Sequence, residues 1–393
     1  MHQKNKETIW SRDFVLLLAV NGITFFSFQV LLPLLPVYGQ LFTASDIILG
    51  ILVSAIAIAA LIIRPLAGLF ADRGNRKIII AVAQLATAVL IALFSVTTSI
   101  QGLIALRFAH GVVFGIVTTS VMLSAVQTLP EARLGRGIGM LGVTTICGQA
   151  VAPALGIFLV DNFGYTTLFL VTASVSAAAV LPALIVRPQP RIMSSEPGIS
   201  IRNFFAVEGL GVAVLILIFT TGISAVLNYL VLFGNSRGIA NIGFYFTIYA
   251  AVLVICRVFG GGLADKYPLW KISGMCAVAS ASGLFLVASA HSFSLIAVAA
   301  VLLGIGHGLS NPAFLAEIIR SVPPDRRGAA SATTYIAMDA ANIICPLAMG
   351  VIASAFDYGA GFYFMGGPIL VTIPIVYLAA RKKERGAGDK GAP

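Results

Sequence analysis

Charged residues are scarce in this chain: Asp, Glu, Lys and Arg make up 10% of its 393 residues, whereas an ordinary soluble domain has about 25%. So few charges cannot cover a water-exposed surface, which excludes a soluble globular protein. Hydrophobic residues make up 59% of the chain. The composition therefore predicts a protein that is largely embedded in lipid.

Cysteine is also rare. The four cysteines form no Cys-x-x-Cys pair and have no histidine nearby at ligand spacing, which argues against a disulfide framework and a metal site. We expect these thiols to be packed among helices. The sequence contains no nucleotide-binding loop and no apparent cleavable signal peptide. It therefore predicts no enzyme, no cofactor and no metal.

Long apolar runs follow one another along nearly the whole chain, each able to cross a bilayer with about 20 helical residues. They are continuous, whereas the strands of a membrane barrel alternate apolar and polar residues. The predicted spans are 13–37, 46–70, 78–96, 102–126, 138–160, 167–187, 206–233, 240–263, 272–290, 294–319, 329–353 and 360–380. We therefore expect an all-α polytopic membrane protein with twelve transmembrane helices.

The formal net charge of +10 is distributed on one side of these spans. With the N-terminus placed in the cytoplasm, 21 of the 25 Lys and Arg residues fall in the termini and the cytoplasmic loops, and only Arg237 lies in an outer loop. This is the positive-inside pattern. It predicts a multi-pass protein of the inner (cell) membrane with both termini cytoplasmic, and it makes nucleic acid an unlikely partner.

The two halves of the chain repeat each other at a spacing of 193 residues. RPLAGLFADRGNRK begins at Arg64 and RVFGGGLADKYPLWK begins at Arg257, and Gly111 and Gly115 are matched by Gly304 and Gly308. Several matches at one spacing predict two pseudo-symmetric six-helix bundles. Because each half has an even number of spans, both keep the same orientation in the membrane.

The expected domains follow from this repeat. Residues 1–187 form the N-terminal bundle, and residues 205–393 form the C-terminal bundle with a short basic tail. The intervening 188–204 is rich in Pro and Ser and is expected to be a flexible cytoplasmic linker.

The repeated loop suggests a gate. Gly68 and Gly261 lie at the inner ends of their helices, with Asp72 and Asp265 one turn later. A carboxylate there can bind the free amides at the start of a helix in the other half. We predict that such breakable contacts form the inner gate; unchanged gating in Asp72→Asn would contradict this.

At these residues the sequence resembles the major facilitator superfamily of secondary transporters. GLFADRGNRK at 68–77 is similar to the signature between helices 2 and 3, and GGLADK at 261–266 to its weaker echo between helices 8 and 9. In the first motif, Gly74 stands one position earlier than the superfamily signature places its glycine. The gating residues implied by the resemblance are Gly68, Asp72, Arg73, Arg76, Asp265 and Lys266.

Two further stretches resemble proton-coupled drug exporters of this superfamily. LRFAHGVVFG at 106–115 is similar to their helix 4 motif, with Arg107 as the buried basic residue. GQAVAPALG at 148–156 is similar to their helix 5 antiporter motif, although Ala152 stands where that motif prefers Gly. The motif residues are Gly148, Ala152, Pro153 and Gly156, whose spacing also suits ordinary close packing of helices.

Ionisable groups inside the spans are candidates for proton coupling, since charges at that depth cost at least a few kcal/mol. The candidates are Arg107, His110, His307 and Asp339. A structural ion pair, a hydrogen-bonded bundle histidine or a permanently protonated aspartate are the alternatives. Asp339 lies about halfway across the bilayer, where desolvation favours its protonated form.

The superfamily resemblance implies a central cavity lined by helices 1, 4, 7 and 10. The cavity candidates are Asn21, Phe25, Phe28 and Gln29 on helix 1, Asn228 and Tyr229 on helix 7, Asn311 on helix 10, and Tyr335 and Asn342 on the face of Asp339. Aromatic rings and amides suit amphipathic organic molecules.

The expected function is therefore proton-driven export of small amphipathic compounds by alternating access. Proton-coupled uptake of a sugar or organic acid is the alternative, with Arg107 binding the anion, and a non-transporting membrane sensor is a third. The expected partners are the lipid bilayer, a small-molecule substrate and protons, and we expect a monomer.

Overall fold

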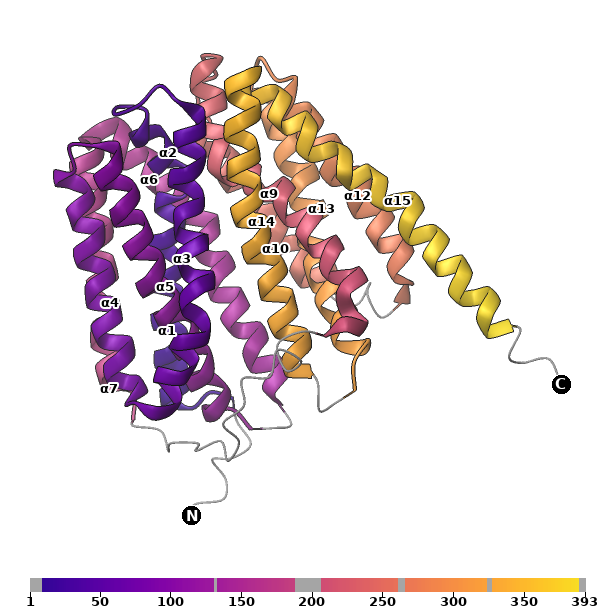
Figure 1. The fold of residues 1–393 in the computed structure, drawn as a ribbon, viewed down its shortest axis with the longest axis horizontal. Helices are drawn as coiled ribbons and strands as arrows, with labels where there is room; N and C mark the ends of the chain where they lie inside the picture. Colours follow the sequence, from indigo (N-terminus) through magenta and orange to yellow (C-terminus); the bar gives the residue numbers. More distant parts are fainter. Residues whose placement is uncertain (1–8, 131–132, 188–205, 261–265, 324–326, 389–393) are drawn as a thin grey trace. The chain divides into compact units, whose positions relative to one another are not determined.

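The computed structural model describes residues 9–130, 133–187, 206–260, 266–323 and 327–388 (Figure 1), and throughout these ranges the chain forms helices joined by short turns, without strands. The chain divides into two compact units, Met1–Pro197 and Gly198–Pro393. The linker expected at 188–204 lies outside the described residues.

The N-terminal unit contains seven described α-helices. They are α1 (Arg12–Leu31), α2 (Leu34–Gly39), α3 (Asp46–Arg73), α4 (Arg76–Leu93) with the 3₁₀ turn η2 (Phe94–Val96), α5 (Ile100–Thr128), α6 (Leu134–Ala178) and α7 (Val180–Ile185).

The C-terminal unit contains six described α-helices. They are α9 (Leu210–Ser236), preceded by the 3₁₀ turn η4 (Val207–Gly209), α10 (Gly243–Gly260), α12 (Leu269–Ala288), α13 (Phe293–Arg320), α14 (Arg327–Ala355) and α15 (Tyr358–Gly388).

Ten helical segments of the described chain are long and apolar enough to cross a membrane. One of them, Arg136–Ile185, has 50 residues and contains two spans, because Gly164 interrupts α6 at φ 78° and ψ 173°. The C-terminal unit also contains the shorter apolar helix Gly243–Arg257. The described residues thus confirm an all-α polytopic membrane protein with six apolar helices in each unit.

The first span is shorter than expected. The sequence predicted one helix to residue 37, but α1 ends at Leu31 and the chain restarts as α2 at Leu34. Pro33 lies between them. Proline has no N–H to donate to the preceding turn, and its ring crowds that turn, which explains the break.

Serine side chains begin several of the helices. Ser11 and Ser99 accept hydrogen bonds from the backbone N–H groups of Phe14 and Gly102, both at 3.2 Å. These N-caps satisfy donors that have no partner within the helix. Each cap stands where an apolar run starts, so local sequence determines where α1 and α5 begin.

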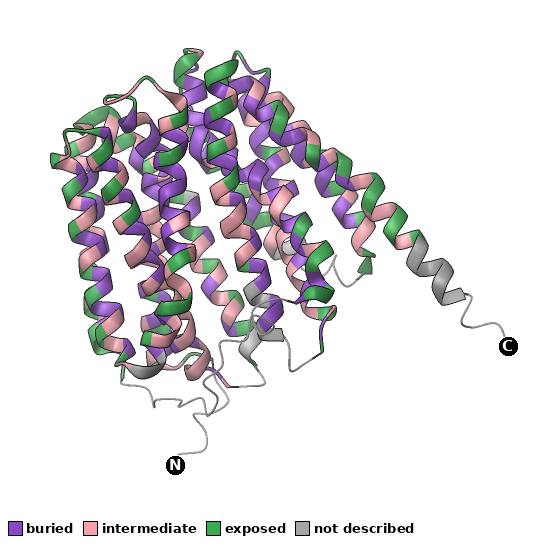
Figure 2. Cartoon of the chain, viewed as in Figure 1, coloured by how far each residue is buried: buried purple, intermediate pink, exposed green. Residues whose placement is uncertain are grey.

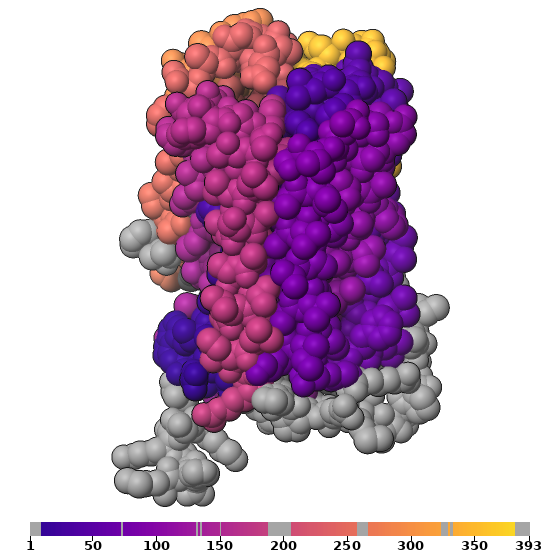
Figure 3. Space-filling model, turned by 90° about the vertical axis from the view of Figure 1, so that its left-hand side faces the viewer, coloured from indigo at the N-terminus to yellow at the C-terminus, as the bar shows by residue number. Residues whose placement is uncertain are grey.

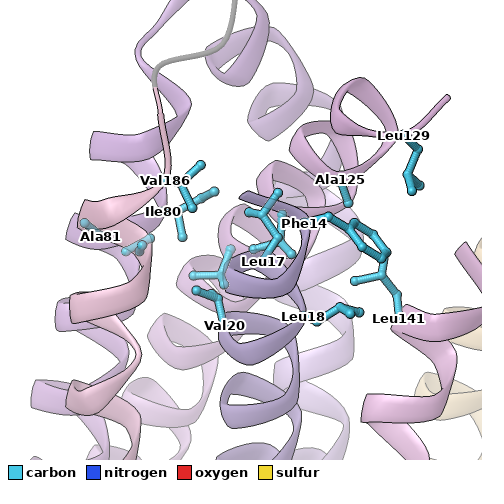
Figure 4. Packing of buried hydrophobic residues seen from close by; sticks show 14 of the residues in the cluster. Phe14, Leu17, Leu18, Val20, Ile80, Ala81, Ala125, Leu129, Leu141 and Val186 are labelled. Carbon is cyan, nitrogen blue, oxygen red and sulfur yellow. The ribbon is translucent and has the colours of Figure 1, made fainter. Parts of the chain in front are cut away.

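Large side chains from several helices fill the interior of the N-terminal unit. Phe14 and Leu17 of α1 pack with Ile80 of α4, Val121 of α5 and Leu141 of α6 (Figure 4). Another cluster of the same unit includes Leu31.

Exposed residues lie along the outer sides of the helices (Figure 2), and many of them are large and apolar. On α4, Ile78, Val82, Leu85 and Val89 recur at helical spacing and are 51–61% exposed. Figure 3 shows side chains of neighbouring helices meeting along the flank of this unit. Exposed apolar stripes of this kind identify surfaces that face lipid.

The same helix pairs pack together in both units. In the N-terminal unit α3 packs on α5 and α1 on α6; in the C-terminal unit the corresponding α10 packs on α13 and α9 on α14. The two pairs α4 with α5 and α12 with α13 also correspond.

Glycines at equivalent positions make equivalent contacts. A methyl group added at Gly111 would strike the backbone oxygen of Ile56, and one added at Gly304 would lie 3.1 Å from the oxygen of Tyr249. Residues 56 and 249 are themselves 193 positions apart. The repeat in the sequence is therefore a repeat in the helix packing.

Candidate functional site

The N-terminal unit buries a cation in its interior. Arg107 and His110 lie one turn apart on α5 and are each 1% exposed. The Nη1 atom of Arg107 lies 3.4 Å from Nδ1 of His110, and its Cζ lies 5.8 Å from the centroid of the Phe28 ring. The sequence prediction that Arg107 and His110 are buried together is consistent with this geometry.

Aromatic rings from two helices surround this cation. Phe28 of α1 stacks on Phe114 of α5 with centroids 4.7 Å apart, and Phe25 meets the edge of Phe114 at 5.6 Å. The His110 ring approaches Phe114 edge-on at 6.4 Å. A cation over such rings is favourable by about 2 kcal/mol or more when it is desolvated.

Arg107 has hydrogen-bonding capacity to spare. Its Nε atom is buried without a hydrogen-bond partner, and among the described residues no carboxylate pairs with it. A buried guanidinium without a counterion is costly, so an anion or a proton acceptor that reaches it gains a strong interaction.

The C-terminal unit places a histidine in the corresponding region. His307 of α13 shares a hydrogen bond through Nδ1 with the hydroxyl of Tyr249 of α10, and the two rings are nearly parallel at 8°. Tyr245 stacks on Tyr249 at 5.8 Å, and its own hydroxyl is buried without a partner. His307 also lines a small pocket with Ser280 and other residues of the same unit.

The face of α14 that carries Asp339 is less buried. Asp339 and Asn342 are half-buried and Tyr335 is 44% exposed. Asn311 of α13 is half-buried as well. On α14, Tyr335, Asp339 and Asn342 share a helix face at i, i+4 and i+7 and carry phenol, carboxyl and amide groups along it.

Two other cavity candidates hold neighbouring helices together. The Asn21 amide donates to Leu141 O at 3.1 Å and to Thr144 Oγ1 at 2.8 Å, which joins α1 to α6. The Tyr229 hydroxyl donates to Pro346 O at 2.9 Å and joins α9 to α14. These two residues therefore have structural contacts whether or not a substrate reaches them.

The remaining amides are buried with part of their polar surface unmatched. Asn228 donates to Ser224 O at 2.8 Å, one turn back on α9, while its Oδ1 atom has no partner. Gln29 is 6% exposed, and its Oε1 atom also has none. Such atoms favour a polar ligand, since an unmatched buried acceptor costs about 1–3 kcal/mol.

The antiporter-like stripe faces α1. A methyl group at Gly148 would lie 3.1 Å from Phe26 N, and one at Gly156 would lie 3.3 Å from Val30 O. Ala152 and Pro153 are buried between them. The only non-helical angles inside α6 are those at Gly164, so the chain keeps helical φ and ψ past Pro153. The stripe lets α6 approach the backbone of α1 closely.

The gating motif is described only in part. Gly68 has open space where a side chain would be, and the Arg76 Nε donates to Ala71 O at 2.7 Å, which caps the end of α3. Lys266 is exposed. The side chains of Asp72 and Arg73, and the whole of Asp265, lie outside the described part, so their role in the gate stays a prediction.

A buried polar network was not anticipated from the sequence. The Gln84 amide of α4 donates to Ser176 Oγ at 2.8 Å, and the Thr24 hydroxyl donates to Gln84 Oε1 at 3.0 Å. Gln84 is the only amide in the span 78–96, which was the signal available. The network joins α1, α4 and α6.

The fold is that of known membrane transporters. The nucleoside transporter NupG superimposes with a TM-score of 0.72 at 13% identity over 94% of this chain and 99% of that one. A bacterial homolog of the human lysosomal transporter Spinster, in an inward-facing and unoccupied conformation, gives 0.76 at 16% identity, covering 94% and 95% of the two chains. At such identities the likeness shows the fold alone.

Sequence comparison shows the family. A model of the Major Facilitator Superfamily matches residues 17–332 and 212–392. This chain belongs to the major facilitator superfamily, as the loop motifs predicted.

Curated relatives within the superfamily include multidrug resistance proteins. The multidrug resistance protein MdtG of Dickeya zeae (strain Ech586) is 25% identical over 391 residues, 95% of this chain and 96% of the relative. The multi-drug resistance efflux pump PmrA of Streptococcus pneumoniae (strain ATCC BAA-255 / R6) is 25% identical over 365 residues, 87% and 90% of the two chains. The protein is thus similar in sequence to efflux proteins along most of its length.

Proposed function

We propose that this transporter exports small amphipathic organic compounds in exchange for inward-moving protons. It works by alternating access of its two six-helix units, in the cytoplasmic membrane and with both termini in the cytoplasm. The observation that carries the proposal is the similarity to multidrug exporters over at least 87% of the chain. The helix 4 and helix 5 motifs support it.

The buried ionisable groups supply the proton chemistry in this proposal. Arg107 is the buried cation of the N-terminal unit, and His307 or Asp339 of the C-terminal unit carries the proton. The hydrogen bond to Tyr249 holds His307 in one orientation. Neutral histidine and protonated aspartate are the forms that tolerate burial, so on hydration a buried aspartate can release a proton and a buried histidine can take one up.

The aromatic residues around Arg107 favour the proposed class of substrate. Phe25, Phe28 and Phe114 offer ring faces and edges for a planar apolar group. On the same helix as Phe25 and Phe28, Gln29 offers an unmatched amide oxygen to a polar substituent. This combination of a few polar atoms and many apolar ones suits amphipathic compounds of varied shape.

Everted membrane vesicles test the proposal. When respiration acidifies the vesicle lumen, adding an exported compound to the bath is expected to release protons from the lumen and to accumulate the compound inside. Vesicles that contain Arg107→Ala protein at equal abundance are the control. Absence of proton release with a broad panel of cationic, neutral and anionic aromatic compounds would contradict proton antiport.

Proton-coupled uptake of an organic acid is a second candidate, and one observation favours it. The guanidinium of Arg107 is buried without a carboxylate partner in the described chain, so a substrate carboxylate would complete it. Uptake predicts that right-side-out vesicles accumulate the acid when the bath is acidified. Everted vesicles would then show no substrate-induced proton release.

A further inference from the structure

A cluster of basic and aromatic side chains lies where two spans of the C-terminal unit end. The apolar span of α12 begins at Leu269, and the span of α15 ends at Arg381. These helices pack against each other. At their junction the rings of Trp270 and Tyr377 meet edge-to-face, with centroids 5.5 Å apart.

A basic side chain lies near each ring of this cluster. Lys271 Nζ lies 5.3 Å from the Trp270 ring, and Arg381 Cζ lies 4.8 Å from the Tyr377 ring. Both basic side chains are exposed. The ring contacts hold two long, flexible cations beside one helix junction and so reduce the entropy that a ligand would otherwise have to remove.

No described acidic side chain lies beside the positive charge of this cluster. Neither residues 266–288 nor residues 358–381 contain an acidic residue, and in the described chain no carboxylate pairs with Lys271 or Arg381. The two cations are therefore available to an external anion.

Exposed apolar stripes run from the two cations along the helices. On α12, Met275 and Val278 follow Lys271 at helical spacing and are 49% and 52% exposed. On α15, Leu378 and Ile375 precede Arg381 and are 64% and 58% exposed. A ligand with an anionic head and long apolar tails would match both parts of this surface.

We propose that the junction of α12 and α15 binds an acidic phospholipid. Lys271 and Arg381 hold the headgroup phosphate, and the acyl chains lie along the two stripes. A lipid is favoured over a soluble phosphate because tryptophan and tyrosine at the ends of spans lie at the membrane–water boundary. Basic residues at that boundary attract acidic lipids. This site is independent of the direction of transport and of the substrate.

Lipid titration of the purified, delipidated full-length protein tests the proposal. Phosphatidylglycerol in mixed micelles is expected to bind saturably and to raise the thermal unfolding temperature, whereas phosphatidylcholine is not. The double variant Lys271→Gln/Arg381→Gln is expected to bind phosphatidylglycerol roughly thirtyfold more weakly. The Lys271→Arg/Arg381→Lys variant, which keeps both charges, is expected to retain most of the affinity.

A matched control and a soluble anion complete the experiment. Arg136→Gln removes an exposed cation near another helix start that has no aromatic ring beside it, and it is expected to leave the affinity unchanged. Equal binding of both lipids, or undiminished binding by the double variant, would overturn the proposal. So would saturable binding of inorganic phosphate that competes with the lipid at similar concentration, because the ligand would then be a soluble anion.

Discussion

The glycines at 111 and 304 occupy equivalent places in the two units, yet the side chains around them differ. Within one turn of Gly111 the N-terminal unit has Arg107 and His110; the C-terminal unit has Ala300 and Leu303 at the matching positions. Conversely, Phe114 is replaced by His307. The repeat has kept the contacts that set how close the helices pack, while the polar groups have diverged.

The same asymmetry extends to the rest of the interior. Gln84 and its partner Ser176 correspond to Ala277 and Ile369, both buried. Asp339 corresponds to Ile146 in the N-terminal unit. Each unit can therefore lose a given polar group without losing its fold, which makes exchanging residues between the units an informative test.

The largest effect is expected at Arg107. Arg107→Ala introduces the alanine that stands at the matching position 300 of the C-terminal unit. It is expected to reduce proton-driven transport on the order of 100-fold. This corresponds to losing two interactions of about 1.4 kcal/mol each. Everted vesicles containing equal amounts of folded protein provide the measurement. Arg107→Lys, which keeps the charge but not the guanidinium geometry, should transport at a rate between those of the wild type and Arg107→Ala. Transport by Arg107→Ala at the wild-type rate would mean that the asymmetry has no role in transport.

The glycine contacts come next, measured by thermal or denaturant unfolding of the purified protein. Gly111→Ala is expected to lower the free energy of unfolding by about 3 kcal/mol, because the added methyl meets a backbone oxygen that cannot move alone. Gly304→Ala should cost somewhat less, about 2 kcal/mol, because its closest contact is the Val252 side chain, with Cβ at 2.8 Å, and Tyr249 O lies 3.1 Å away. Gly142 and Gly274, which have open space at the added methyl, provide matched controls for the two units. If the controls are destabilised equally, close packing is not the reason for these glycines.

The Gln84 network should have a smaller effect on stability. Gln84→Ala leaves the hydroxyls of Thr24 and Ser176 without this partner and is expected to cost about 2 kcal/mol. Gln84→Leu also removes the hydrogen bonds but leaves a smaller cavity than Gln84→Ala. Comparing the two variants therefore distinguishes the cost of the lost hydrogen bonds from the cost of the cavity. A loss of transport with unchanged stability would instead assign the network a direct role in transport.

The smallest effect is expected at Tyr249. Tyr249→Phe removes the hydroxyl that contacts His307 but keeps the stack with Tyr245, and it should cost about 1 kcal/mol of stability. A double-mutant cycle with His307→Gln measures how much of that energy belongs to the pair. Strict additivity of the two changes would show that the hydrogen bond contributes nothing.

Much of the fold could be predicted because lipid imposes simple rules on the sequence. Long apolar runs and the 193-residue repeat predicted the helices and the two six-helix units. Arg107 and His110 could be recognised as buried because an ionisable residue inside a membrane span avoids lipid by facing the interior of the helix bundle. Pro33 was misjudged, since proline is tolerated in many membrane helices and the sequence alone does not show whether the helix bends or stops.

The contacts between helices were harder to predict. The pairing of His307 with Tyr249 depends on the register of α10 against α13, which Gly304 and Gly308 fix through contacts 52 or more residues away in sequence. Cys147 was expected inside the packing and is exposed, because its side of α6 lies opposite the glycine stripe that contacts α1. Periodicity identifies an apolar face but not which neighbour covers it.

The turn at Gly164 has a mechanical consequence. In the N-terminal unit, the fifth and sixth spans are joined by a single residue with positive φ. In the C-terminal unit, only two residues separate α14 from α15. A connector this short leaves no slack, so neither helix of such a pair can slide along its axis without pulling the other. Within each unit, these two spans therefore transmit force as one stiff hairpin, and lengthening the connector by a few glycines would uncouple them.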